Sequence, residues 1–305
     1  MTIARRTLIV GLATGATTLA AVAAVRAASG IGGAPPTLLA AVPPPSPIQA
    51  TVGPDALVLP QWRANAIQQP RMTGRPAIVV VIDDMGWMHP HTERAIALPG
   101  PLTLSWFPFA HHLPEQVAAG AARGHEATLH MPMQVHSNSI LQTGPDPLRI
   151  DLPPAVNLAR LKAAMDAVPQ TVGLNNHMGT VATCDPALMD LVAAETRARG
   201  MLFLDSIVIG RSVALARAQA AGVPATGRDF FIDWAMHPDI IAKALSDIEE
   251  AARKHGHTIA IGHPRGLTLD ALEAWLPTLE KKGFDLWPLS TAVALRNGID
   301  MSKIA

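Results

Sequence analysis

Short apolar runs alternate with amphipathic stretches from about Ala77 to the end of the chain. The runs are apolar throughout, as is typical of strands that are covered on both faces. Strands that alternate with helices indicate a parallel α/β fold with crossover helices. The predicted strands are 77–82, 102–106, 127–130, 172–175, 201–205, 229–233, 258–262 and 285–288. The predicted helices lie near 113–123, 155–167, 186–199, 212–221, 238–255 and 269–281.

Five of the apolar runs end in residues that can bind a metal or transfer a proton. These strand-end residues are Asp83-Asp84, His130, Asn175-Asn176-His177, Asp205-Ser206 and His263. Because parallel strands bring their carboxyl ends to one face, where such folds build active sites, we expect these residues to share one pocket. Each alone also fits a structural role, since a strand-end Asp often caps the next helix or turn and a lone histidine often packs. Their recurrence at five strand ends favours a site.

The strand-end residues include a candidate metal-binding set. Two neutral histidines and one carboxylate, with a position open to water, make a catalytic zinc site, and Asp84, His130 and His177 fit that count. Adjacent strand residues point to opposite faces, so Asp83 and Asp84 can share a pocket only where the strand ends and turns, which Gly86 would permit. Six further histidines in helical or loop segments are interpreted as surface residues: His89, His91, His111, His112, His255 and His257.

Composition narrows the class of partner and of chemistry. The 24 basic residues are balanced by 24 acidic ones without a basic stripe, so nucleic acid is not expected as a partner. No phosphate-binding loop, dinucleotide fingerprint or nucleophile elbow is present, which disfavours nucleotide, hydride-transfer and serine-hydrolase chemistry. The single cysteine, Cys184, cannot form an intramolecular disulfide and is interpreted as a packing residue.

The N-terminus has the pattern of a targeting segment. Arg5-Arg6 precede an uncharged stretch from Thr7 to Val25, which fits either a cleaved signal peptide or an N-terminal membrane anchor. Either one places the rest of the chain in the periplasm or cell envelope. A proline-rich composition without helical or strand period then predicts a semi-extended linker. The expected organisation is signal or anchor 1–28, linker 29–76, catalytic domain 77–298 and tail 299–305.

The strand-end motifs resemble those of the polysaccharide deacetylase superfamily, and more closely its divergent branch, over roughly Ala77 to Ala294. The run Ile82-Asp83-Asp84-Met85-Gly86 is similar to the family's first motif, in which the first Asp is the base and the second a metal ligand. Gly124-His125-Glu126 followed by His130 is similar to the second motif. Three further runs look like signatures of the divergent branch: Asn175-Asn176-His177-Met178-Gly179, Phe203-Leu204-Asp205-Ser206 and Ile261-Gly262-His263-Pro264.

This resemblance implies a distorted (β/α) barrel of about seven parallel strands and a zinc, or another divalent metal, in the pocket. It also implies removal of acetyl groups from an N-acetylated polysaccharide or other glycan. Ordinary members carry a second histidine four residues after the first, where this chain has Gln134, and we hypothesise that His177 replaces it. The usual arginine-proline motif is missing. The alternative is a non-catalytic envelope protein that binds glycan or a protein partner.

In the catalytic interpretation, Asp83 accepts a proton from the attacking water and His263 protonates the departing amine. Either Asp205 or Asp233 orients His263. The remaining expected substrate contacts are Asn176, Ser206, Trp87 and Trp106. The two tryptophans come just after strand ends and fit a sugar platform or, equally, core or rim packing.

Overall fold

The computed structural model describes residues 59–67, 73–87, 89–136, 143–168 and 170–300. The predicted signal or anchor, most of the predicted linker, and residues 301–305 of the predicted tail lie outside these ranges. Among the described helices, none combines the length and the apolar character needed to cross a membrane.

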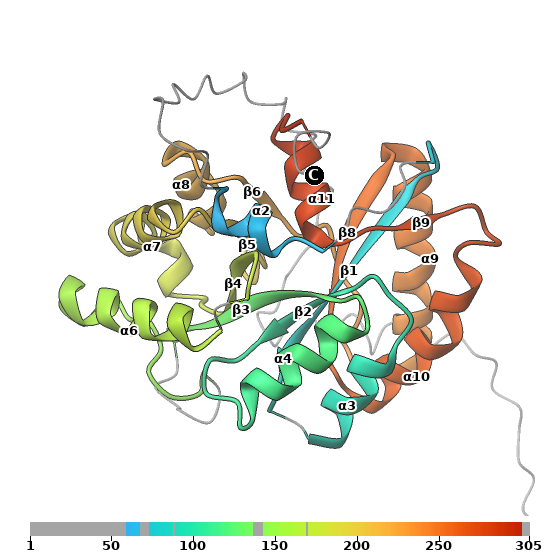
Figure 1. Cartoon of the computed structure of the whole chain (residues 1–305), viewed down its shortest axis with the longest axis horizontal. Coiled ribbons are helices and arrows are strands. Elements are labelled where there is room, and N and C mark those ends of the chain that lie inside the picture. The colour runs from blue at the N-terminus through green and yellow to red at the C-terminus, as the bar shows by residue number, and fades with distance from the viewer. Residues whose placement is uncertain (1–58, 68–72, 88, 137–142, 169, 301–305) are drawn as a thin grey trace, which may run out of the picture. The chain divides into compact units, whose positions relative to one another are not determined.

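Within these described ranges, nine strands form one parallel sheet in the order β6-β5-β4-β3-β2-β1-β8-β7, with β9 beside β1 (Figure 1). Their bounds are β1 Ala77–Met85, β2 Thr103–Trp106, β3 Glu126–Met133, β4 Gly173–Met178, β5 Leu202–Asp205, β6 Ala225–Gly227, β7 Phe230–Phe231, β8 His257–Gly262 and β9 Asp285–Leu286. The sheet curls into a barrel that stays open between β6 and β7 in the described chain. The distorted (β/α) barrel is therefore confirmed. The additional strand, β6, was not predicted.

The helices flank this sheet. Their bounds are α2 Gln61–Asn65, α3 His89–Ala97, α4 Leu113–Ala122, α6 Pro154–Ala167, α7 Pro186–Ala198, α8 Ala214–Ala220, α9 Pro238–His255, α10 Gly266–Trp275 and α11 Leu289–Arg296. Figure 1 shows α4, α6 and α7 along the outer side of the sheet, with α9 and α10 beside β1 and β8. The helix α11 contacts β1, β6 and β8, so it fills one end of the barrel. All six predicted helices are present, whereas α2, α3 and α11 were not predicted.

The two faces of each strand enter different cores. In β1, Ile78 and Val80 belong to the core beneath the flanking helices, whereas Val79 and Val81 belong to a second core. This second core joins β1 and β8 to β5, strands that are far apart in the sheet order, so it lies inside the curve of the sheet. Successive strand residues alternate between these faces. The alternation decides which strand-end side chains enter the barrel.

The predicted linker 29–76 extends too far. Residues Gln61–Asn65 form α2, and Trp62, which is 3% exposed, packs in the second core. Gln61 and Asn65 donate side-chain hydrogen bonds to the Thr171 carbonyl. A five-residue helix is too short to show a helical period in the sequence, so its burial was not evident. The folded domain begins before Ala77.

Glu126 is a buried carboxyl at the start of β3, at the end of the barrel that α11 fills. Its Oε2 accepts a hydrogen bond from the Ser290 backbone N–H at 2.9 Å. Burial nevertheless dominates and raises the pKa of Glu126 to about 7. A group with a raised folded-state pKa contributes stability that is fully present below its unfolded value, 4.5, and that is lost as the pH rises through about 7.

We therefore expect the free energy of unfolding to fall with rising pH through this group. Between pH 5 and pH 8 the wild type should lose on the order of 2 kcal/mol relative to Glu126→Gln, which stays neutral and still accepts from Ser290. Urea unfolding of both proteins at the two pH values measures this difference. Parallel pH dependences of the two proteins would contradict the assignment.

Candidate metal centre

Two adjacent carboxylates reach the same pocket at the end of β1. Asp83 continues the inward-facing series of Val79 and Val81 and is 2% exposed. Asp84 would point outward in a regular strand, but its backbone has φ 58 and the pairing of β1 with β2 shifts register between Ile82 and Met85. A bulge of this kind re-aims a side chain. The irregular backbone at Asp84 therefore lets both carboxylates share the pocket, as predicted from the Asp-Asp pair.

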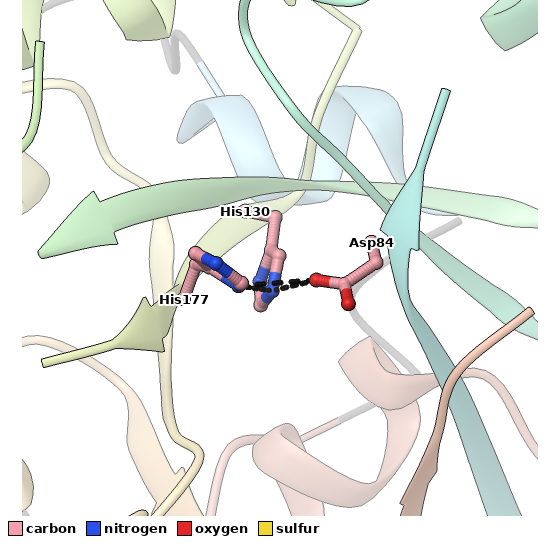
Figure 2. Close-up of side chains that lie close together, drawn as sticks. All are labelled: Asp84, His130 and His177. Carbon is pink, nitrogen blue, oxygen red and sulfur yellow. Dashed lines mark hydrogen bonds and ion pairs between the residues drawn. The ribbon is translucent and has the colours of Figure 1, made fainter. Parts of the chain in front are cut away.

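Asp84 and His177 lie at the carboxyl ends of β1 and β4, and they meet His130, which lies within β3 three residues before its end (Figure 2). Asp84 Oδ1 lies 3.1 Å from His130 Nε2 and 3.0 Å from His177 Nδ1, and the two ring nitrogens are 3.1 Å apart. Three ligand atoms of a tetrahedral zinc ion lie about 3.3 Å apart at ordinary zinc bond lengths. The observed triangle is close to that spacing. The three residues predicted as ligands are thus brought together.

The carboxylate oxygen of this triangle supports the same interpretation. Asp84 Oδ1 is buried and accepts no well-directed hydrogen bond, although two ring nitrogens lie within ion-pair distance. A buried carboxylate oxygen without such a partner is costly unless a cation satisfies it. The donor set of two imidazoles and one carboxylate suits zinc and similar divalent ions. The residues present therefore fit a divalent metal.

The charged groups of the site shift one another's pKa values. Burial alone would raise the pKa of the Asp84 carboxyl, but the close ring nitrogens of His130 and His177, together with the charges of His130 and His263, hold that pKa well below its usual range. Burial lowers the pKa of His130, yet the charges of Asp83 and Asp84 outweigh it and raise the pKa overall. Asp84 is therefore held as a carboxylate, the form that binds a cation.

Asp83 lies beside the triangle without belonging to it. Its Oδ2 is 3.8 Å from His130 Nε2, and its Oδ1 accepts a hydrogen bond from Asn175 Nδ2 at 2.8 Å. Burial raises the pKa of Asp83, against the opposing charges of His130 and His263. A buried carboxylate of raised basicity next to a metal position is suited to accept a proton.

His263 is held by Asp233 at the carboxyl ends of β8 and β7. Asp233 Oδ1 accepts from His263 Nδ1 at 2.8 Å, while its Oδ2 accepts from the His263 backbone N–H at 2.9 Å and from Thr268 Oγ1 at 2.8 Å. Burial lowers the pKa of His263, but the hydrogen bond and charge of Asp233 outweigh it and raise that pKa. Of the two predicted orienting carboxylates, Asp233 is the one in contact.

Asp205 does not face the site. Its Oδ1 accepts from the Ile207 backbone N–H, and its Oδ2 accepts from Ser212 Oγ and from the Leu215 N–H in α8. The neighbouring Leu204 faces the inner core, so Asp205 faces the helices. The prediction that Asp205 supports catalysis is wrong, because its carboxylate points away from His263 and the metal triangle and caps the segment that enters α8.

Asn176 and Ser206 are also structural. Asn176 Oδ1 accepts from the Ser206 N–H at 2.9 Å, and its Nδ2 donates to the Met178 carbonyl. Ser206 Oγ donates to the Asn176 carbonyl and accepts from Asn175 Nδ2. Both side chains are 1% exposed, so the predicted substrate contact is corrected to a tie between β4 and the loop after β5.

The two predicted tryptophan platforms have different surroundings. Trp106 is 1% exposed and packs in the core beneath the helices, because inward-facing Ser105 precedes it in β2. Trp87 is 44% exposed and makes edge contacts with the rings of Phe107 and Phe109, with centroids 5.1 and 5.3 Å away. Phe107 in turn contacts the His177 ring at 4.7 Å. Of the two tryptophans, only Trp87 is exposed where a molecule bound at the site could contact it.

Gln134 does not reach toward the metal triangle. Its Oε1 accepts from the Ile150 N–H at 2.8 Å, and its backbone pairs with Leu148.

Among the predicted surface histidines, His111, His112 and His255 are exposed, whereas His91 and His257 are half-buried. His257 accepts from Arg296 Nε at 2.9 Å and therefore serves packing. The side chain of His89 lies outside the described residues.

Three further polar residues of the site were not assigned a role from the sequence. Ser105 and Asn175 form a buried hydrogen-bonded pair that contacts Asp83 and His130. Arg228 packs its guanidinium over the Phe231 ring at 3.6 Å and donates to the Ser206 and Ile207 carbonyls. Burial lowers the pKa of Arg228 to about 10, so it remains charged at neutral pH. It lies in the irregular opening between β6 and β7, where no sequence pattern marked it.

An open barrel of parallel strands, with an aspartate and two histidines near the carboxyl ends of those strands, is the arrangement expected of a protein of the polysaccharide deacetylase type. Residues 80–293 match the divergent polysaccharide deacetylase family. The chain belongs to that family.

Two curated relatives are similar to this chain in sequence, and one solved structure is similar in fold. An uncharacterized protein of Haemophilus influenzae is 33% identical over 202 residues, which make up 66% of this chain and 71% of the relative. The uncharacterized protein YibQ of Escherichia coli K12 is 32% identical over 209 residues, 68% of this chain and 64% of YibQ. The crystal structure of the uncharacterized protein ATU2773 from Agrobacterium tumefaciens C58 aligns with TM-score 0.73 and 23% identity, covering 77% of this chain and 95% of that one. At this sequence identity, the similarity to ATU2773 is a similarity of fold alone.

Proposed function

We propose that the protein is a zinc-dependent hydrolase that removes acetyl groups from an N-acetylated glycan of the cell envelope. The triangle of Asp84, His130 and His177, with the buried Asp83 beside it, carries the proposal. Family membership supports the reaction class. The location rests on the targeting pattern of residues 1–28.

The roles of the side chains follow from their surroundings. A divalent cation held by the triangle would supply Lewis acidity toward water and an amide carbonyl. Asp83 takes the proton that the attacking water loses. His263 donates its Nδ1 proton to the Asp233 hydrogen bond, so its charged form presents Nε2–H to the departing amine. Water adds to the acetyl carbon, the C–N bond breaks, and acetate and a free sugar amine result.

The test is acetate release from an N-acetylated oligosaccharide by the zinc-loaded and the chelated protein. We expect acetate and free amine in equal amounts from the zinc-loaded protein, and neither after chelation. Full zinc occupancy without acetate release would overturn the proposed reaction.

A glycan-binding protein without turnover is the second candidate. The observation that favours it is Gln134, whose side chain is held by Ile150 where ordinary deacetylases carry a metal-binding histidine. This candidate predicts glycan binding by the zinc-loaded chain with no acetate formed. The acetate measurement therefore separates the two functions.

Trp87 should contribute to glycan binding. Its exposed ring is joined through Phe107 to His177, so a sugar at the metal position could stack on it. Aromatic stacking contributes about 0.5–1.5 kcal/mol, so Trp87→Ala should raise the KM about 3- to 10-fold with kcat little changed. Leu295→Ala is the control, because Leu295 is equally exposed, at 44%, and lies in α11 at the other end of the barrel. An unchanged KM in Trp87→Ala would place the sugar elsewhere.

A further inference from the structure

Asn175 contacts both the base and a metal ligand through one side-chain amide. Its Nδ2 donates to Asp83 Oδ1 at 2.8 Å, and its Oδ1 lies 2.9 Å from His130 Nδ1. Ser105 Oγ donates to the same Oδ1 of Asn175 at 2.5 Å, and Nδ2 also donates to Ser206 Oγ at 3.2 Å. Asn175 is 0% exposed. The amide is therefore held at both ends, away from water.

The chemistry of these partners fixes which way the amide points. An ionised carboxylate only accepts hydrogen bonds, so Asp83 must face the NH₂ group. The carbonyl oxygen then faces His130, which must donate its Nδ1 proton to it. His130 Nε2 is left to face Asp84 and His177 as the ligand atom. Hydrogen bonds of this kind select the tautomer of metal-binding histidines and orient their rings.

We propose that Asn175 is a positioning residue that couples the two parts of the site. Its carbonyl oxygen sets His130 for metal binding, and its NH₂ group holds the Asp83 carboxylate beside the metal position. This inference rests on the proposed function for the role of Asp83, whereas the contact with His130 does not depend on turnover. Rotation of this one amide would break both contacts at once.

Two substitutions separate the two contacts. Asn175→Asp keeps an oxygen acceptor for His130 and Ser105 but replaces the NH₂ donor with a carboxyl oxygen, which either repels the Asp83 carboxylate or shares a proton with it and so removes its position or its basicity. We expect zinc affinity within about threefold of wild type, or higher, and acetate release reduced at least ~100-fold. Asn175→Ala removes both contacts, and its zinc affinity should fall about 10- to 100-fold. Zinc affinity is measured by chelator competition without substrate.

Asn176→Ala is the matched control. Asn176 is the next residue of β4, is equally buried, and uses its amide to hold the Ser206 N–H and the Met178 carbonyl. Its loss should lower thermal stability while zinc affinity and the turnover of the folded protein stay near wild type. A purely structural Asn175 would instead behave like this control.

Each outcome bears on one claim. Wild-type acetate release by Asn175→Asp with zinc bound would overturn the hold on Asp83, and wild-type zinc affinity in Asn175→Ala would overturn the hold on His130. If Asn175→Asp does not fold, Asn175→Ser supplies the same two measurements, with losses of both zinc affinity and turnover expected. Absence of acetate release from the wild type would instead count against the proposed function, and the zinc measurements would still test Asn175.

Discussion

Replacing His177 by alanine should lower the affinity for zinc by on the order of 100-fold or more. In the proposed site the imidazole supplies one of three protein ligand atoms, and binding free energies of zinc sites are large enough that each ligand carries several kcal/mol. His177 Nδ1 lies 3.0 Å from Asp84 Oδ1, and a water in its place would lack the fixed position that the strand gives the ring. Chelator competition on the purified chain measures the loss, and acetate release should disappear with it.

The control for this substitution is His255→Ala. His255 is exposed in the last turn of α9, so its removal should change neither zinc affinity nor turnover. Far-ultraviolet circular dichroism and the midpoint of thermal unfolding establish that His177→Ala is folded. Full zinc retention by the folded variant would show that His177 is not a ligand, and Gln134 would then have to be tested as the third ligand.

The sheet was largely predictable because its strands are buried on both faces and stand out as continuous apolar runs. Seven of the eight predicted strands overlap β1, β2, β3, β4, β5, β8 and β9, although β3 and β4 extend further than predicted and β9 is shorter. The prediction for 229–233 fails in part, because β7 spans only Phe230–Phe231 and a separate three-residue strand, Ala225–Gly227, precedes it. Strands this short show no periodicity, and the barrel opens where they lie.

Because these runs are apolar on both faces, the sequence does not show which of their side chains point into the barrel. A strand that is polar on one face reveals its inner positions, but in β5 Leu202, Phe203 and Leu204 are all buried, although they enter two different cores. Asp205 could therefore not be assigned to the outer face from the sequence. Once the inner face is known, simple alternation from Val79 and Val81 places Asp83 correctly.

Asp84 is the exception that alternation alone would misplace. Its positive φ turns the carboxylate into the pocket, and the sequence indicated this through the Asp-Asp pair and the nearby Gly86. The converse holds for Ser105 and Asn175, which alternation places inside the barrel, although the sequence did not indicate Ser105 at all and indicated Asn175 only as a member of the pocket without a specific role. The three candidate metal ligands were thus predictable from chemistry, whereas the residues proposed to position them depend on the faces of the strands.

Asp83→Asn should reduce acetate release by about 10²- to 10⁴-fold while zinc stays bound. The substitution preserves shape, and the new carbonyl oxygen still accepts from Asn175 Nδ2, so the pocket should remain intact. The variant lacks only the group that accepts a proton. Because Asp83 Oδ2 lies 3.8 Å from His130 Nε2 and outside the ligand triangle, zinc affinity should change less than about tenfold.

Asp205→Asn is the control that shows whether the effect is specific to Asp83. Asp205 is also 2% exposed, but its carboxylate caps the segment that enters α8 on the outer face of the sheet. The same chemical change there should lower the midpoint of thermal unfolding and leave the turnover of the folded protein near wild type. Equal acetate release by wild type and Asp83→Asn would place the base elsewhere. Loss of zinc from Asp83→Asn would instead make Asp83 a ligand, since a base outside the triangle can be neutralised without releasing the metal.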